Sequence, residues 1–120
     1  MPGQKRVLIV EDEKPLQHAL ELKLQREGYE TISAHNGQEA LDLLKRDRFD
    51  VVLLDLMMPV IDGFQVLEQH ASFASTPVIF VLSNLSQRED EERVIALGAK
   101  KYFIKSDTPL SVIVEEVKNA

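Results

Sequence analysis

Short apolar runs alternate along this chain with longer segments in which apolar residues recur at helical spacing. Four short runs are continuously apolar, and three of them hold several β-branched residues, a pattern typical of strands in a sheet that is covered on both faces. A fifth run is mixed in polarity, as expected for an edge strand. The four apolar runs are Val7–Val10, Val51–Leu54, Val78–Leu82 and Tyr102–Ile104, and the mixed run is Tyr29–Ala34.

Five amphipathic segments follow these runs, each with apolar residues at helical spacing and with turn or capping residues at its ends. The predicted helices run from Pro15 to Gly28, from Gln38 to Lys45, from Gly63 to Ala71, from Ser86 to Gly98 and from Thr108 to Val117. Ser86 and Glu89 have the spacing of a capping box, and Thr108 is expected to cap a helix whose first turn holds Pro109.

Strands that alternate with helices predict an α/β fold with a parallel sheet and right-handed crossovers. Eight units are needed to close a barrel, so five give an open, doubly wound sheet. In such sheets ligands bind beyond the carboxyl ends of the strands, where the strand order reverses. Functional residues are therefore expected at the strand ends.

Polar residues follow four of the five predicted strands at those ends. Glu11 and Asp12 follow the first strand, Asp55 the third, Ser83 the fourth and Lys105 the fifth. The first and third strands are natural neighbours at the point of reversal, so their three carboxylates should converge.

Three converging carboxylates need a cation to stay ionised together. Mg²⁺ suits the site because it takes oxygen ligands and needs only one or two carboxylates plus a phosphate, and Mn²⁺ is an alternative ion. Lys105 adds a fixed positive charge and Ser83 a hydroxyl donor. The set fits phosphoryl transfer, in which positioning and charge neutralisation do most of the catalysis, with Asp55 as the acceptor.

Each residue alone also has a structural interpretation. Glu11 and Asp12 could form a solvated turn or cap a helix, Ser83 could be a loop residue, and Lys105 could be a surface charge. Their joint placement favours function, because Asp55 directly follows four apolar residues and so must sit at a buried strand end. No metal role is assigned to the histidines, which lack ligand-like spacing: His18, His35 and His70.

Composition narrows the function further. A chain of 120 residues is expected to form one domain. The absence of cysteine removes thiolate chemistry and suits the reducing cytoplasm, where we expect the protein. A net charge of −6 disfavours nucleic acid as a direct partner, and no membrane span or signal peptide is expected. No glycine-rich nucleotide loop or Gly-x-Ser-x-Gly motif is present.

The whole chain resembles the receiver domain of two-component response regulators, the family that includes chemotaxis regulators. The matching motifs are the acidic pair after Val7–Val10, the segment from Asp55 to Pro59 followed by Asp62-Gly63, then Ser83, Leu97-Gly98-Ala99 and Lys105. The resemblance implies a flavodoxin-like sheet with strand order 2-1-3-4-5. It also implies a single receiver domain over residues 1–120 with no output domain in this chain, whether stand-alone or part of a longer regulator.

The resemblance assigns a role to each site residue. Asp55 would accept a phosphoryl group from a phosphohistidine on a sensor histidine kinase or phosphotransfer protein. Asp12 would bind Mg²⁺ directly, Glu11 mostly through water, and the backbone carbonyl of Met57 would complete the protein ligands. Lys105 would pair first with Asp55 and then with the phosphoryl oxygens.

The resemblance also implies a switch. Ser83 would move to the phosphoryl group and Tyr102 would rotate inward behind it. The output face would be the fourth helix, fifth strand and fifth helix, read by a downstream protein or by a missing output domain. The protein would be a monomer, with dimerisation on phosphorylation left open.

The expected function is a signalling switch and not an enzyme, with only Mg²⁺-dependent phosphotransfer and autodephosphorylation of its own. One alternative is a receiver-fold adaptor that works without phosphorylation. The other is an aspartate-nucleophile phosphohydrolase, which would want a second aspartate where Met57 stands.

Two residues depart from the family pattern. Ser106 stands where the family usually has proline, so the preceding peptide bond is expected to be trans and the loop somewhat different. Asn84 stands where the family commonly has a smaller residue, and its side chain could restrict access to Asp55.

Overall fold

The computed structural model describes residues 4–85 and 87–120. Strands and helices alternate along the chain, with a short 3₁₀ turn, η1, after the third helix and another, η2, after the fifth strand. In order they are β1 (Arg6–Val10), α1 (Lys14–Arg26), β2 (Glu30–Ala34), α2 (Gly37–Arg46), β3 (Val51–Asp55), α3 (Gly63–Glu68), η1 (His70–Ser72), β4 (Val78–Ser83), α4 (Arg88–Ala96), β5 (Lys101–Ile104), η2 (Lys105–Asp107) and α5 (Leu110–Lys118).

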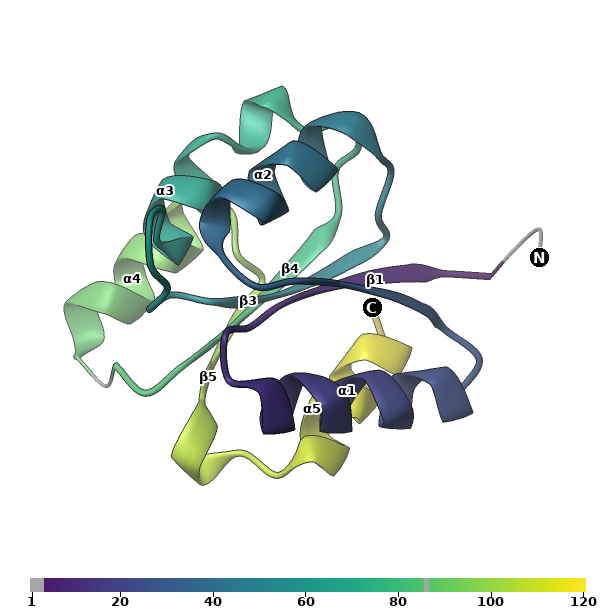
Figure 1. The fold of residues 1–120 in the computed structure, drawn as a ribbon. Coiled ribbons are helices and arrows are strands. Elements are labelled where there is room, and N and C mark those ends of the chain that lie inside the picture. The colour runs from purple at the N-terminus through teal and green to yellow at the C-terminus, as the bar shows by residue number, and fades with distance from the viewer. Residues whose placement is uncertain (1–3, 86) are drawn as a thin grey trace.

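The strands form one parallel sheet in the order β2-β1-β3-β4-β5, which confirms the expected flavodoxin-like fold. Helices α1 and α5 cover one face, and α2, α3 and α4 cover the other (Figure 1). The mixed run at 30–34 is an edge strand, as its polarity predicts. Among the helices of the described residues, none is both long and apolar enough to cross a bilayer.

Each face of the sheet has its own hydrophobic core. Along β1, Leu8 and Val10 pack into the core beneath α2 and α3, whereas Val7 and Ile9 pack into the core beneath α1 and α5. Every residue of β3 is buried. The continuously apolar runs of the sequence are therefore explained by a sheet with two covered faces.

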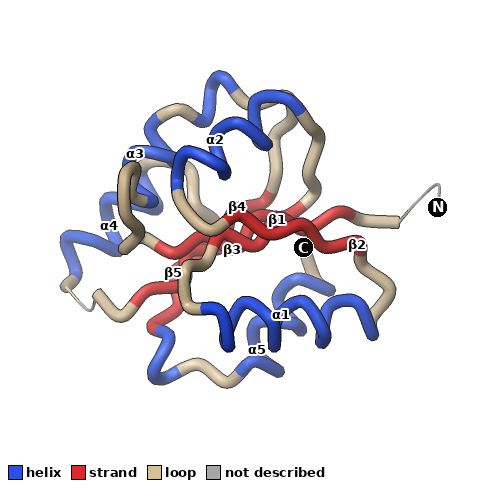
Figure 2. The backbone as a smooth tube through the Cα atoms, in the orientation of Figure 1, coloured by secondary structure: helices blue, strands red, loops and turns tan. Residues whose placement is uncertain are grey.

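The central strands bring their carboxyl ends to one edge of the sheet. From β1 the chain crosses to β2 on one side, and from β2 it returns to β3 on the other side of β1 (Figure 2). The loop after β1 leads to α1 and the loop after β3 leads to α3, on the opposite face, so the two loops separate and leave a crevice at this point of reversal.

Most predicted helix ends lie within two residues of the observed ones, but the end of the third helix and the cap of the fifth need correction. The third helix ends at Glu68 rather than Ala71, because the chain tightens into η1, where the His70 ring bonds to the Leu67 carbonyl and the Ser72 hydroxyl donates to the Gln69 carbonyl. Thr108 is not the cap of α5: its hydroxyl donates to the carbonyl of Ile104, and the N-cap position falls to Pro109.

The expected capping box of the fourth helix involves Ser86, which lies outside the described residues. The N-cap of α4 is Gln87, and its side chain makes no capping hydrogen bond.

Candidate functional site

Two strand ends place buried carboxylates side by side. Glu11 follows β1 and is held there by the hydrogen bond from its N–H to the carbonyl of Ala34, whereas Asp55 is the last residue of β3. Both side chains are buried. Asp12 is exposed, yet one carboxylate oxygen from each of the three residues lies within 4.8 Å of the others. The three carboxylates therefore converge, as the topology predicts.

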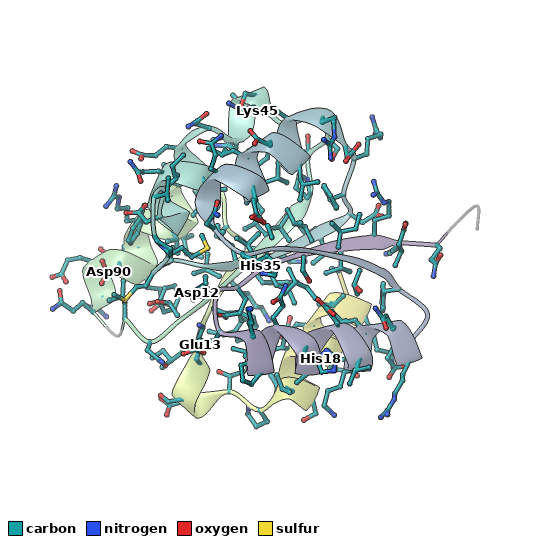
Figure 3. All side chains as sticks on the ribbon, viewed as in Figure 1. Asp12, Glu13, His18, His35, Lys45 and Asp90 are labelled. Atoms are coloured by element: carbon teal, nitrogen blue, oxygen red, sulfur yellow. The ribbon has the colours of Figure 1, made fainter. Side chains whose placement is uncertain are left out.

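Lys105 reaches into this cluster from η2. Its Nζ donates to Glu11 Oε2 at 3.0 Å and to Asp55 Oδ2 at 3.1 Å, and it lies 3.6 Å from Glu13 Oε2. Figure 3 shows Asp12 and Glu13 where β1 runs into α1. The lysine therefore lies between the carboxylates of two strands. Its proximity to Glu13 was not predicted, because Glu13 lies beyond the strand end on an exposed turn.

One buried oxygen in the cluster lacks a hydrogen bond. Lys105 Nζ lies 2.8 Å from Glu11 Oε1, but in a geometry that is not a hydrogen bond, and no described residue donates to this atom. The ammonium offsets part of the charge on this oxygen, yet the oxygen keeps its capacity to accept a bond or to bind a further cation. The residues present therefore fit a hard divalent cation, with oxygen donors from Glu11, Asp12 and Asp55.

Burial also changes the proton affinity of the cluster. Desolvation raises the pKa of Glu11 from 4.5 to about 7, although the hydrogen bond from Lys105 opposes the shift. Desolvation raises the pKa of Asp55 too, and the charge of Lys105 opposes it. Burial alone would lower the pKa of Lys105, but its hydrogen bond to Glu11 and the charge of Asp55 raise it. A single ammonium thus only partly compensates the two buried carboxylates.

The carboxylate of Asp55 is fixed in orientation by both of its oxygens. Lys105 holds Oδ2, and the backbone N–H of Met57 donates to Oδ1 at 3.2 Å. Gly63 packs against the same strand end: a Cβ added there would lie 2.5 Å from the carbonyl oxygen of Asp55. Only glycine lets α3 begin this close to the acceptor. The sequence motif showed Gly63 as a helix start, but not this contact.

Ser83 and Tyr102 lie together on neighbouring strands. The hydroxyl of the fully buried Ser83 accepts a hydrogen bond from the N–H of Leu85 at 3.2 Å, and the Tyr102 hydroxyl donates to the Leu85 carbonyl. Burial raises the pKa of Tyr102, and a side-chain hydrogen bond with Ser83 opposes that shift. The sequence could not reveal Leu85 as their common partner, because only its backbone takes part.

An open groove of about 500 Å³ adjoins the cluster at Asp12. Its lining residues are Asp12, Leu56, Met57, Met58, Pro59, Asp62 and Leu85. The Met57 side chain is largely exposed, whereas Met58 packs against the hydrophobic core. The groove gives a ligand in solution a direct route to Asp12.

The histidines lie outside this site. His18 and His35 are exposed, and the ring of His70 contacts the carbonyl of Leu67 at 2.9 Å. Figure 3 shows His18 on α1. Within the described residues, the three carboxylates form the only group of acidic or imidazole side chains placed to hold a metal ion.

Comparison with known families gives a match over most of the chain. The family model described as the response regulator receiver domain matches residues 7–117. The chain belongs to this family. Receiver domains are signalling domains of two-component systems and not classical enzymes.

This receiver domain is also similar to curated proteins. It is 37% identical over 106 residues to a probable transcriptional regulator, ycf27, of Porphyridium aerugineum. The alignment covers 88% of this receiver domain and 44% of that regulator. A second ycf27 regulator, from Guillardia theta, is also 37% identical and is covered to 41%. The chain therefore spans less than half of the length of these relatives.

Solved structures share the fold. The receiver domain protein of Methanospirillum hungatei superposes with a TM-score of 0.90 at 24% identity, covering 98% of this chain and 93% of that one. The response regulator protein TrrA of Thermotoga maritima is 34% identical, with a TM-score of 0.81 and coverage of 97% and 98%. That protein was solved in complex with Mg²⁺ and BeF.

Proposed function

We propose that this receiver domain is a phosphoacceptor switch in which Asp55 takes a phosphoryl group from a phosphohistidine. The donor would be a sensor histidine kinase or a histidine phosphotransfer protein. The observation that carries the proposal is the buried carboxylate of Asp55, which Met57 N–H and Lys105 Nζ orient within a cluster of acidic side chains.

The chemistry follows from this geometry. A carboxylate oxygen of Asp55 attacks phosphorus while the phosphorus–nitrogen bond breaks, and the electron pair leaves on the imidazole nitrogen, which takes up a proton. The product is an acyl phosphate. The switch is reset by hydrolysis: water attacks phosphorus, the bond between phosphorus and the Asp55 oxygen breaks, and inorganic phosphate leaves the restored carboxylate. Lys105 Nζ already touches Asp55 Oδ2, so it can pass to a phosphoryl oxygen formed there.

A divalent cation completes the proposal. Asp12 and Asp55 would hold Mg²⁺, or Mn²⁺ in its place, with Glu11 acting mostly through water, and the backbone carbonyl of Met57 would complete the protein ligands. When bound, the ion would neutralise charge that builds up on the transferring phosphoryl oxygens. Support comes from the three converging carboxylates and from the Glu11 oxygen that lacks a hydrogen-bond donor.

Ser83 and Tyr102 would transmit the modification. A phosphoryl group on Asp55 offers new acceptor oxygens, which would draw the Ser83 hydroxyl away from its contacts with Leu85 and Tyr102. Because Tyr102 also donates to the Leu85 carbonyl, such a movement would change the loop before α4. The output face would then be the surface of α4, β5 and α5.

Residues 1–120 would act as one receiver domain, a monomer before phosphorylation. The changed output face would be read by a downstream protein or by an output domain joined to the receiver. Whether the phosphorylated form dimerises can be measured by sedimentation of the modified protein.

Phosphorylation by a small donor tests the proposal. We expect acetyl phosphate with Mg²⁺ to add one phosphoryl group to the intact protein, as seen by mass, and excess EDTA to suppress the reaction. Asp55→Asn should abolish it. Asp90→Asn is the matched control, because it makes the same chemical change on α4, outside the carboxylate cluster, and should leave the reaction intact. An unmodified wild type, or equal labelling of Asp55→Asn, would overturn the proposal.

A further inference from the structure

A hydrogen bond links the two loops that carry Ser83 and Lys105. The backbone N–H of Ser106 donates to the side-chain oxygen Oδ1 of Asn84 at 3.1 Å. Asn84 directly follows Ser83, and Ser106 directly follows Lys105. The contact therefore joins the residues next to two members of the candidate site.

The position of this contact in the sheet gives it a mechanical role. The parallel pairing of β4 with β5 ends at Ser83 and Ile104. Beyond this pair, the segment after β4 enters the loop before α4, and the segment after β5 enters η2. The side chain of Asn84 connects these two segments past the point where the strand pairing stops.

The contact also satisfies a backbone group that η2 leaves open. An N–H in the first turn of a helix has no partner within that helix, and Ser106 is the second residue of η2. Thr108 secures the base of the same turn by donating to the carbonyl of Ile104 at 2.8 Å. Asn84 and Thr108 thus hold η2 from two sides.

Lys105 is the side chain that depends on this turn. It is the first residue of η2, and its Nζ must extend across the edge of the sheet to reach Glu11 after β1 and Asp55 on β3. A small rotation of η2 would displace Nζ from both carboxylates. Fixing the backbone at Ser106 therefore limits the positions that Nζ can take.

We propose that Asn84 and Ser106 form a clasp that positions Lys105 for phosphoryl transfer, with Asn84 as a positioning residue. The two departures from the family pattern are then two halves of one contact, because a proline at 106 would have no N–H to donate. The clasp rests on the proposed function, since Lys105 acts there on the phosphoryl group of Asp55. Both clasp residues are exposed, so the contact acts through geometry and not through burial.

The first test compares variants in their rate of phosphorylation by acetyl phosphate at saturating Mg²⁺. Asn84→Ala removes the acceptor, and we expect the rate to fall by about threefold to tenfold, the range that the loss of one hydrogen bond allows. Ser106→Ala keeps the N–H and should react like the wild type. Ser106→Pro removes the N–H and should be slow, and adding Asn84→Ala to it should cause no further loss. Since proline also restricts Lys105, the Asn84 variant is decisive.

The second measurement separates positioning from general stability. Hydrogen exchange of the Ser106 amide should be faster in Asn84→Ala than in the wild type, while the global free energy of unfolding stays nearly unchanged. A wild-type or faster phosphorylation rate in Asn84→Ala would overturn the clasp; a faster rate would show that Asn84 instead covers Asp55. If the wild type accepts no phosphoryl group, the proposed function fails, whereas an unprotected Ser106 amide in the wild type refutes the clasp alone.

Discussion

Glu11 is a buried carboxylate whose proton affinity differs strongly from that of a carboxylate in water. The residue is 1% exposed, and one of its carboxylate oxygens lacks a hydrogen-bond donor among the described residues. Burial of this carboxylate raises its pKa to about 7, so without a metal ion the group is partly protonated near neutral pH. The metal-free cluster is therefore expected to respond to pH where most carboxylates do not.

The first prediction concerns the stability of the metal-free protein. A carboxyl whose pKa is raised on folding contributes stability that is complete below its unfolded pKa of 4.5 and is lost as the pH approaches 7. In EDTA, the free energy of unfolding should therefore fall between pH 4.5 and pH 7.5 by about 3 kcal/mol from this group. Urea denaturation across this range measures it. Glu11→Gln should flatten the dependence, and parallel curves for the two proteins would contradict it.

The stabilisation of the fold by added Mg²⁺ should increase with pH, whereas the contribution of protonated Glu11 decreases with pH. Metal ligands must be deprotonated, so the ion competes with protons for Glu11 and Asp55. The rise in unfolding free energy on adding Mg²⁺ is therefore expected to be larger at pH 8 than at pH 5.5.

The second prediction concerns Lys105, whose ammonium lies between two buried carboxylates. The Lys105 side chain is only 11% exposed, so Lys105→Ala removes the cation of a largely buried ion pair. The substitution should lower the free energy of unfolding by about 3 kcal/mol at pH 8 in EDTA. The loss should be smaller at pH 5.5, because protons can then neutralise Glu11 and Asp55. Denaturant unfolding measures both.

Lys101→Ala is the control, because this lysine pairs with Glu116 on the exposed side of β5. Its removal should cost about 1 kcal/mol or less at either pH. Equal losses for the two lysines would refute the special position of Lys105.

At the scale of the elements, the contact between α3 and β3 determines where Asp55 sits. The capping box of Asp62 and Gln65 starts α3 at Gly63, and Gly63 N–H donates to the carbonyl of Leu56 at 2.9 Å. The first turn of α3 thus packs directly on the backbone of the acceptor strand.

The third prediction tests this contact. Gly63→Ala would place a Cβ 2.5 Å from the Asp55 carbonyl oxygen, so the backbone must shift, at a cost of about 2 kcal/mol in unfolding free energy. Phosphorylation by acetyl phosphate should slow as well. Gly28→Ala is the control: its φ of +92° makes alanine strained, but an added Cβ would touch nothing, so stability should fall with no change in phosphorylation rate. Equal phosphorylation rates for both variants would contradict the account.

The sequence predicts the elements well and their ends less well. Strands such as Val51–Leu54 are predicted because an uninterrupted apolar run has no other place in a small α/β domain. The Thr108 cap was wrong because capping propensity does not show that a carbonyl at Ile104 competes for the same hydroxyl. Such competition depends on tertiary distances.

At the scale of the molecule, the convergence of Glu11, Asp12 and Asp55 was predictable because topology alone brings the ends of β1 and β3 together. The placement of Lys105 between two carboxylates was not, because the reach of a long side chain across a sheet depends on the turn that carries it. The bond between Asn84 and Ser106 was also invisible: the sequence marked both as departures without linking them.

The central claim is that modification of Asp55 on β3 is transmitted through Ser83 on β4 to Tyr102 on β5. Strand β5 lies two strands away from the acceptor strand. The most direct test is a titration with beryllofluoride, a phosphoryl mimic, followed by the backbone chemical shifts of the isotope-labelled protein. The account predicts Mg²⁺-dependent shifts at Ser83, Leu85 and Tyr102 in the wild type and none of them in Asp55→Ala. Unchanged signals at saturation, or the same shifts without Asp55, would contradict it.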